Sequence, residues 1–151
     1  MKLEIFTDGG CSGNPGPAAI GVVIKQGAKT IQTFARDIGQ GTNNIAEYTA
    51  LIFALQEALI LKADEVSVKT DSELMAKQVS GEYAVKHENI KPLFHQVKHL
   101  ITGFKSFQIT HVPREQNAQA DALVRQVLKK AGQDGRSDAY GVGEESPSSK
   151  G

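Results

Sequence analysis

The spacing of the apolar residues changes along the chain, and this change constrains the fold more than any other feature. Over residues 3–8, 20–26 and 29–38 the pattern is typical of three strands, and the short turn between the last two suits a tight hairpin. Over residues 44–62 the apolar positions recur every three or four residues, which predicts a helix with a wide buried face. The chain therefore begins with paired strands and then switches to a helix.

The remaining sequence alternates between these two patterns. Strands are predicted over residues 65–70 and 106–112, and helices over 72–79, from about 90, and over 118–131. A hairpin followed by alternating helices and strands indicates an α/β fold. We expect a five-stranded mixed sheet, with its first three strands antiparallel and the later ones parallel, flanked by helices on its faces.

The sequence after residue 131 differs in composition from the rest. Residues 132–151 contain five Gly, four Ser and one Pro, so they cannot bury enough apolar surface to offset the entropy of ordering. We predict one domain over residues 1–131 and a disordered tail over 132–151. No stretch approaches the ~20 apolar residues of a membrane helix, and the single cysteine excludes an internal disulfide. We therefore expect a cytoplasmic monomer with no membrane partner.

The charge balance predicts at most a modest attraction to a polyanion. The chain has 17 Lys and Arg against 17 Asp and Glu. Residues 132–151 hold two basic and four acidic residues, which leaves 15 basic and 13 acidic residues, a charge of +2, in residues 1–131. If four of those acids bound metal, the rest of that body would carry +6. This is enough to attract phosphate weakly, but it is not the basic footprint of a tight nucleic-acid binder.

Four acidic residues are expected where α/β sheets form their sites. Asp8 and Asp71 end the first and fourth predicted strands, and Glu47 and Asp121 fall in the first turns of two predicted helices. Four carboxylates in a small space cannot all stay ionised without cations, and oxygen ligands select hard ions such as Mg²⁺ or Mn²⁺. Two such ions about 4 Å apart can drive in-line displacement at phosphorus.

Each acid also has a purely structural alternative. Residues 44–47 match a capping box, which alone would explain Glu47. Asp71 could cap the helix that follows it, and Asp121 could be a first-turn acid that the helix dipole favours. Asp8 has no helix to cap, although a turn role fits the glycines that follow it. Only the four positions taken together favour a metal site.

Four sequence blocks, in the same order, resemble those of the type 1 ribonucleases H. They are TDGGCSGNPGPA at residues 7–18, TNNIAE at 42–47, KTDS at 69–72 and REQNAQADAL at 114–123. The resemblance covers residues 3 to about 130. It implies a ribonuclease H-like fold and a metal-dependent endoribonuclease that hydrolyses the RNA strand of RNA–DNA hybrids. The products would carry 5′-phosphate and 3′-hydroxyl ends.

The resemblance also implies roles for individual residues. Two Mg²⁺ ions, or Mn²⁺ as a substitute, would be held with the substrate by Asp8, Glu47, Asp71 and Asp121. Thr42 would meet a DNA phosphate. The other substrate contacts, most of them to the RNA strand, would be Gly9, Cys11, Asn14, Asn43, Asn44, Glu73 and Asn117. Discrimination would rest on the RNA 2′-hydroxyl, which DNA lacks, while the alternative for the two residues at 43 and 44 is that they only start a helix.

Two departures from the family pattern leave roles open. Many relatives carry a histidine ten residues before the last aspartate, on a glycine-rich loop, where it helps move protons or release product. His111 has that spacing but continues a strand pattern, and no glycine follows it, so Arg114 is the other candidate. Some bacterial relatives also insert a basic, tryptophan-bearing protrusion, which residues 81–91 lack. We therefore expect weaker hybrid binding.

Two alternatives to hybrid cleavage stay open at this point. The chain could be a non-catalytic hybrid-binding module, because a fold does not dictate a function. The presence of all four acids opposes that alternative. The second alternative is a related nuclease that also cuts double-stranded RNA, as reported for some members of the branch without the protrusion. The sequence does not decide it.

Overall fold

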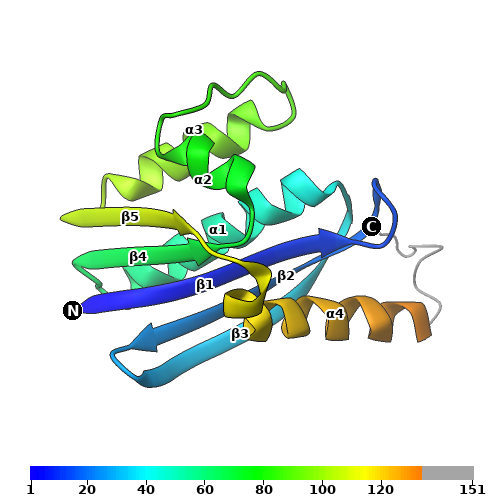
Figure 1. The fold of residues 1–151 in the computed structure, drawn as a ribbon, viewed down its shortest axis with the longest axis horizontal. Helices are drawn as coiled ribbons and strands as arrows, with labels where there is room; N and C mark the ends of the chain where they lie inside the picture. Colours follow the sequence, from blue (N-terminus) through cyan, green and yellow to red (C-terminus); the bar gives the residue numbers. More distant parts are fainter. Residues whose placement is uncertain (134–151) are drawn as a thin grey trace.

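The computed structural model describes residues 1–133, which form one sheet covered by helices on both faces (Figure 1). The sheet has five strands in the order β3-β2-β1-β4-β5. The strands are β1 Lys2–Cys11, β2 Gly16–Gln26, β3 Lys29–Gly41, β4 Glu65–Thr70 and β5 Ser106–His111. β1 pairs antiparallel with β2 and parallel with β4, β2 pairs antiparallel with β3, and β4 pairs parallel with β5. The predicted mixed sheet is therefore confirmed.

The helices divide between the two faces of the sheet. They are α1 Asn43–Ile60, α2 Glu73–Val79, α3 Lys91–Ile101 and α4 Ala118–Gln133, with the short 3₁₀ helix η1 Arg114–Asn117 before α4. α1 packs on β1 and β2 and contacts α3, whereas α4 packs on β1, β2 and β3 (Figure 1). Consecutive residues of a strand point to opposite faces, and α1 lies over Gly9 while α4 lies over Gly10.

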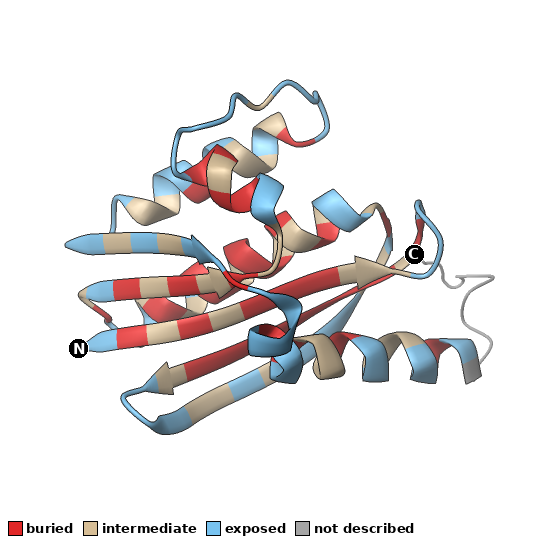
Figure 2. Cartoon of the chain, viewed as in Figure 1, coloured by how far each residue is buried: buried red, intermediate tan, exposed pale blue. Residues whose placement is uncertain are grey.

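The main core lies between the sheet and α1 (Figure 2). Apolar strand residues such as Leu3 and Ile5 are fully buried there, against Leu51 and Leu55 of α1. The face of α1 that meets the sheet also has small side chains at a spacing of four residues, at Ala46, Ala50, Ala54 and Ala58, all of them buried. Small side chains let the helix axis approach the strands closely, which brings residues near its N-terminus next to β1.

The hairpin of β1 and β2 is longer than the sequence predicted. β1 continues past Asp8 to Cys11, and β2 begins at Gly16, so Asp8 pairs with Gly21 inside the ladder. The prediction that Asp8 ends its strand was wrong, because glycines are poor strand formers and hide the extension. The pairing of β1 with β4, however, stops at Thr7 and Thr70. Asp8 is thus the first residue of β1 without a β4 partner.

The last helix is slightly longer than the sequence predicted. α4 extends to Gln133, two residues past the predicted end of this helix at residue 131. The rest of the predicted disordered tail lies outside the described residues. Within residues 1–133, no helix combines the length and the apolar character that a membrane span requires.

Candidate active site

Three of the four predicted acids meet at the end of the central strands, where the pairing of β1 with β4 stops. One carboxylate oxygen from each of Asp8, Glu47 and Asp71 lies within 4.8 Å of the others. Asp8 comes from the middle strand, Glu47 from the second turn of α1, and Asp71 from the residue directly after β4. Parallel β1 and β4 end their pairing side by side, and the close approach of α1 adds the third carboxylate.

The caps of the two nearby helices exclude two of the structural alternatives. Thr42, not Asn44, is the N-cap of α1, and its hydroxyl accepts from the backbone N–H of Ile45 at 3.2 Å. Glu47 is therefore not part of a capping box. Ser72 caps α2 in the same way, by accepting from the backbone N–H of Met75 at 3.2 Å, so Asp71 is not a cap.

Glu47 is held in place by β1 rather than by its own helix. Its Oε1 accepts a hydrogen bond of 3.1 Å from the backbone N–H of Gly9, the residue after Asp8. A side chain at Gly9 would overlap the backbone of Ala46 and would lie 2.5 Å from the backbone nitrogen of Glu47. Only glycine therefore fits at this position of the strand.

Asp121 lines the same cavity as the other three acids. It lies in the first turn of α4, as predicted, and it accepts from Nε of Arg125 at 2.9 Å, one helical turn later. The alternative role of Asp121, a first-turn acid that the helix dipole favours, therefore also fits. Asp121 nevertheless lies close enough to Asp8 to raise the pKa of the Asp8 carboxyl.

Burial and mutual repulsion dominate the electrostatics of the site. Burial, the charges of Asp71 and Asp121 and a hydrogen bond with Asp121 raise the pKa of Asp8 to about 7. Burial, and after it the charges of Asp8 and Asp71, raise the pKa of Glu47 well above its usual value. The hydrogen bond from the Gly9 N–H and the charge of Arg114 lower this pKa, but by less. Such a cluster is fully charged at neutral pH only beside a cation. Since its donors are all carboxylate oxygens, the residues fit a hard divalent ion.

The structure separates the two candidates for the assisting residue. Arg114 lines the cavity, and its Nε lies 3.6 Å from Oδ2 of Asp71. His111 is exposed at the end of β5, opposite Thr70, and is not among the residues that line the cavity. Together with the larger effect of Lys77, the charge of His111 lowers the pKa of Glu73 on the surface of α2.

The predicted substrate residues near the start of α1 are linked to one another. The side-chain oxygen of Asn43 accepts from the backbone N–H of Cys11 at 3.2 Å, and that of Asn14 accepts from the backbone N–H of Asn43 at 3.1 Å. With these oxygens engaged, each side chain presents its NH₂ group as the remaining polar group, which suits acceptors such as sugar or phosphate oxygens. Asn44 and Glu73 are both exposed.

Asn117 lies where the sequence did not place it. It is 1% exposed, and its Nδ2 donates to the backbone carbonyl of Thr7 at 2.9 Å. Its side chain does not reach the surface on which a substrate would lie. The burial arises where α4 meets β1, a contact between distant parts of the chain that no local pattern indicates.

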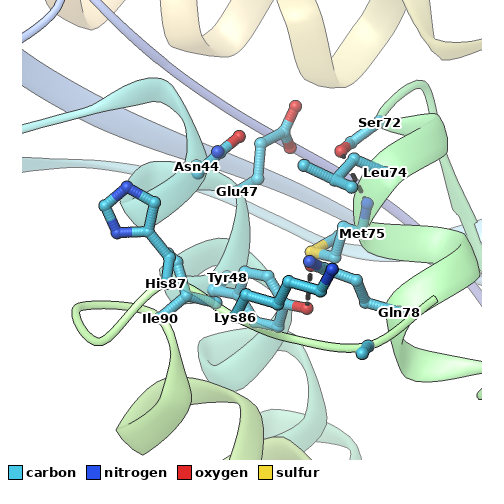
Figure 3. Close-up of a pocket in the computed structure, with 11 residues that line it drawn as sticks. Asn44, Glu47, Tyr48, Ser72, Leu74, Met75, Gln78, Lys86, His87 and Ile90 are labelled. Atoms are coloured by element: carbon cyan, nitrogen blue, oxygen red, sulfur yellow. Dashed lines mark hydrogen bonds between the residues drawn. The ribbon is translucent and has the colours of Figure 1, made fainter.

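A second cavity borders Glu47 on the side of α2 (Figure 3). Tyr48 and Gln78 are among its lining residues, and the Tyr48 hydroxyl donates to Oε1 of Gln78 at 2.7 Å. Burial raises the pKa of Tyr48 to about 12, so the hydroxyl stays a donor. Neither residue was singled out in the sequence, where Tyr48 is simply one apolar position of a helix.

Comparisons with known proteins agree with this geometry. The chain matches the family described as reverse transcriptase-like over residues 6–127. It is 40% identical to ribonuclease HI of Halobacterium salinarum, over 86% of this chain and 66% of that protein. It is also 38% identical to a bifunctional protein of Mycobacterium tuberculosis, and this alignment covers 100% of this chain and 43% of that protein. The chain thus spans less than half the length of the mycobacterial relatives.

Solved structures give the same assignment. The ribonuclease H1 of Halobacterium salinarum superposes with a TM-score of 0.84 at 38% identity, over 87% of this chain and 100% of that one. LC11-RNase H1, solved in complex with an RNA/DNA hybrid, superposes with a TM-score of 0.80 at 43% identity, over 85% and 98%. The sheet order and the helices thus define a ribonuclease H fold. The chain belongs to the reverse transcriptase-like family, in its type 1 ribonuclease H branch.

Proposed function

We propose that this chain is a metal-dependent endoribonuclease that hydrolyses the RNA strand of RNA–DNA hybrids and leaves 5′-phosphate and 3′-hydroxyl ends. One observation carries the proposal: Asp8, Glu47 and Asp71 converge within 4.8 Å, and Asp121 lines the same cavity. The names of the relatives support it, because they include ribonuclease HI and an RNase H1 solved with an RNA/DNA hybrid.

In this proposal the four acids hold two Mg²⁺ ions once substrate is bound, with Mn²⁺ as a substitute. Such ions supply the activation of water and the stabilisation of the leaving oxygen. Asp8 is the central ligand, because it interacts with both Asp71 and Asp121. Arg114, at the mouth of the cavity, would approach the scissile phosphate and takes precedence over His111 as the assisting residue.

The rim beside the acids would bind the hybrid. The RNA strand would lie along the β1–β2 turn and the start of α1 and α2, against Gly9, Cys11, Asn14, Asn43, Asn44 and Glu73. The NH₂ groups of the asparagines would donate to RNA oxygens, including 2′-hydroxyls. Thr42, whose hydroxyl already caps α1, would meet a DNA phosphate. We expect the protein to act as a monomer in the cytoplasm.

One assay tests the proposal. The protein and its Asp71→Asn variant are incubated with labelled RNA–DNA hybrid, double-stranded RNA and double-stranded DNA, with Mg²⁺ or EDTA. The matched control is Asp64→Asn, an exposed aspartate that pairs with the N-terminal amine at 2.7 Å. We expect cleavage of the hybrid by the unmodified protein and by the control, only with metal.

Other outcomes would change the assignment. Hybrid binding without cleavage by the unmodified protein would favour the non-catalytic binding module. Cleavage of double-stranded RNA in addition to the hybrid would widen the substrate class without changing the chemistry. Equal cleavage by Asp71→Asn would remove the proposed site.

A further inference from the structure

The buried amide of Asn117 joins the two chain segments that supply Asp8 and Asp121. Asn117 Nδ2 donates to the carbonyl of Thr7, the residue before Asp8, and Asn117 itself lies four residues before Asp121. Asn117 ends η1, and Asp121 lies in the first turn of α4, which packs on β1. This hydrogen bond ties the end of η1, directly before α4, to the backbone of β1.

The bond lies where β1 is otherwise least supported. The pairing of β1 with β4 stops at Thr7, so Asp8 has a neighbouring strand only on the β2 side. At the same point Asp8 and Asp121 line one cavity. The Asn117 bond holds the backbone of β1 and the segment directly before α4 together there.

The energetics of the pair point to geometry rather than to stability. Among residues 1–133, Thr7 Oγ1 and Asn117 Oδ1 are the buried side-chain polar atoms without a hydrogen-bond partner. Burying an unsatisfied polar atom is unfavourable, and apolar pairs of the same shape can be equally stable. Both of these atoms belong to the two residues that the single bond connects, so the pair is a poor device for stability alone.

We infer that Asn117 is a positioning residue, which fixes the separation of Asp8 and Asp121 for metal binding, and that it is not a substrate contact. The inference rests on the proposed metal site, and it replaces the role that the sequence resemblance implies for Asn117. It acts through the backbone: the amide holds the carbonyl of Thr7, and the next residue presents its carboxylate at a fixed distance from α4.

The test is the affinity for Mn²⁺, measured by calorimetry on the intact protein without substrate. Asn117→Leu keeps the branched shape and removes the donor, and Asn117→Ala serves if the larger leucine side chain prevents folding. Gln78→Met is the matched control, because it also removes a buried amide, the one that accepts from Tyr48 on another element. We expect Mn²⁺ affinity to fall about tenfold for the Asn117 variants and to stay within twofold for Gln78→Met.

Cleavage provides the second measurement. We expect the Mg²⁺ concentration for half-maximal hybrid cleavage to rise about tenfold in Asn117→Leu, with the rate recovering at saturating Mg²⁺. Unchanged Mn²⁺ affinity in the Asn117 variants would overturn the inference. If hybrid binding were weaker in the same variants, Asn117 would be a substrate contact. If only the melting temperature were lower, Asn117 would have a purely structural role. If the unmodified protein binds no Mn²⁺, the proposed function fails instead.

Discussion

The backbone N–H of Gly9 donates to Oε1 of Glu47 at 3.1 Å, so the strand that carries Asp8 and the helix that carries Glu47 are bonded to each other within the site. This contact exists because the backbone of α1 at Ala46 lies directly over a residue with no side chain. The same approach sets the height of α1 above β1 and the position of the Glu47 carboxylate.

Replacing Gly9 with alanine should therefore displace α1 and weaken metal binding. The new Cβ would overlap the backbone of Ala46, which cannot rotate away as a side chain can. We expect a loss of about 2 kcal/mol or more in the free energy of unfolding, measured by urea denaturation, with weaker Mn²⁺ binding by calorimetry. Gly10→Ala is the control, since its Cβ would meet only Cγ1 of Val124 at 3.4 Å. Equal behaviour of the two variants would contradict this explanation.

Neutralising Asp8 should stabilise the protein when metal is absent. The folded-state pKa of Asp8 is about 7 against an ordinary value of 3.8, so between these values the folded protein holds more protons than the unfolded one. Stability then falls as pH rises through this window, and the penalty is complete above about pH 7. In EDTA at pH 8, the free energy of unfolding measured by urea denaturation should be about 2 kcal/mol higher for Asp8→Asn than for the unmodified protein. At pH 5 this gain should be smaller. A gain that did not change with pH would disprove the electrostatic cause.

Metal binding should strengthen as the pH rises from 6 to 8. Protons compete with the cation for Asp8, and for Glu47, whose pKa is also raised. The increase in melting temperature on adding Mn²⁺ should accordingly be larger at pH 8 than at pH 6. Asp64→Asn, at the exposed N-terminal ion pair, should show the same dependence as the unmodified protein. A pH-independent increase would mean that the ion binds elsewhere.

Removing Arg114 should tighten metal binding and slow cleavage. Its guanidinium lies 3.6 Å from Asp71 and is 79% exposed, so its loss removes a modest repulsion against an incoming cation. Exposed ion pairs contribute about 0.2–1 kcal/mol, which corresponds to Mn²⁺ binding about 1.4- to fivefold tighter in Arg114→Ala. We expect hybrid cleavage to fall at least about tenfold in that variant and to change little in His111→Ala. The reverse order of the two cleavage rates would make His111 the assisting residue.

Much of this site could be predicted from the sequence because its acids are signalled by local patterns. The end of β4 places Asp71, and the helical periodicity around residues 44–62 places Glu47 near a helix start. The sequence pattern pointed to Asn44 as a cap of α1, because residues 44–47 match a capping box, although threonine at position 42 is also a good cap type. That choice decides whether Glu47 serves the helix or the site, and only the structure shows that Thr42 is the cap.

The parts that could not be predicted depend on contacts between distant segments. Gly9 and Gly10 gave no strand signal, so the extension of β1 past Asp8 was missed, although α1 and α4 enclose the strand there. The family resemblance implies a substrate contact for Asn117, which would place its side chain on the surface. Its burial arises from the packing of α4 on β1, which no local propensity encodes.

The position of β1 in the middle of the sheet has a consequence for the lifetime of the site. Strands at the edge of a sheet open in local fluctuations, whereas a strand paired on both sides over most of its length exchanges its amide hydrogens mainly through global unfolding. Residues 2–7 of β1, directly before Asp8, should therefore belong to the slowest-exchanging part of the described chain. The ligand geometry should persist without metal, so that loading or losing ions needs no refolding.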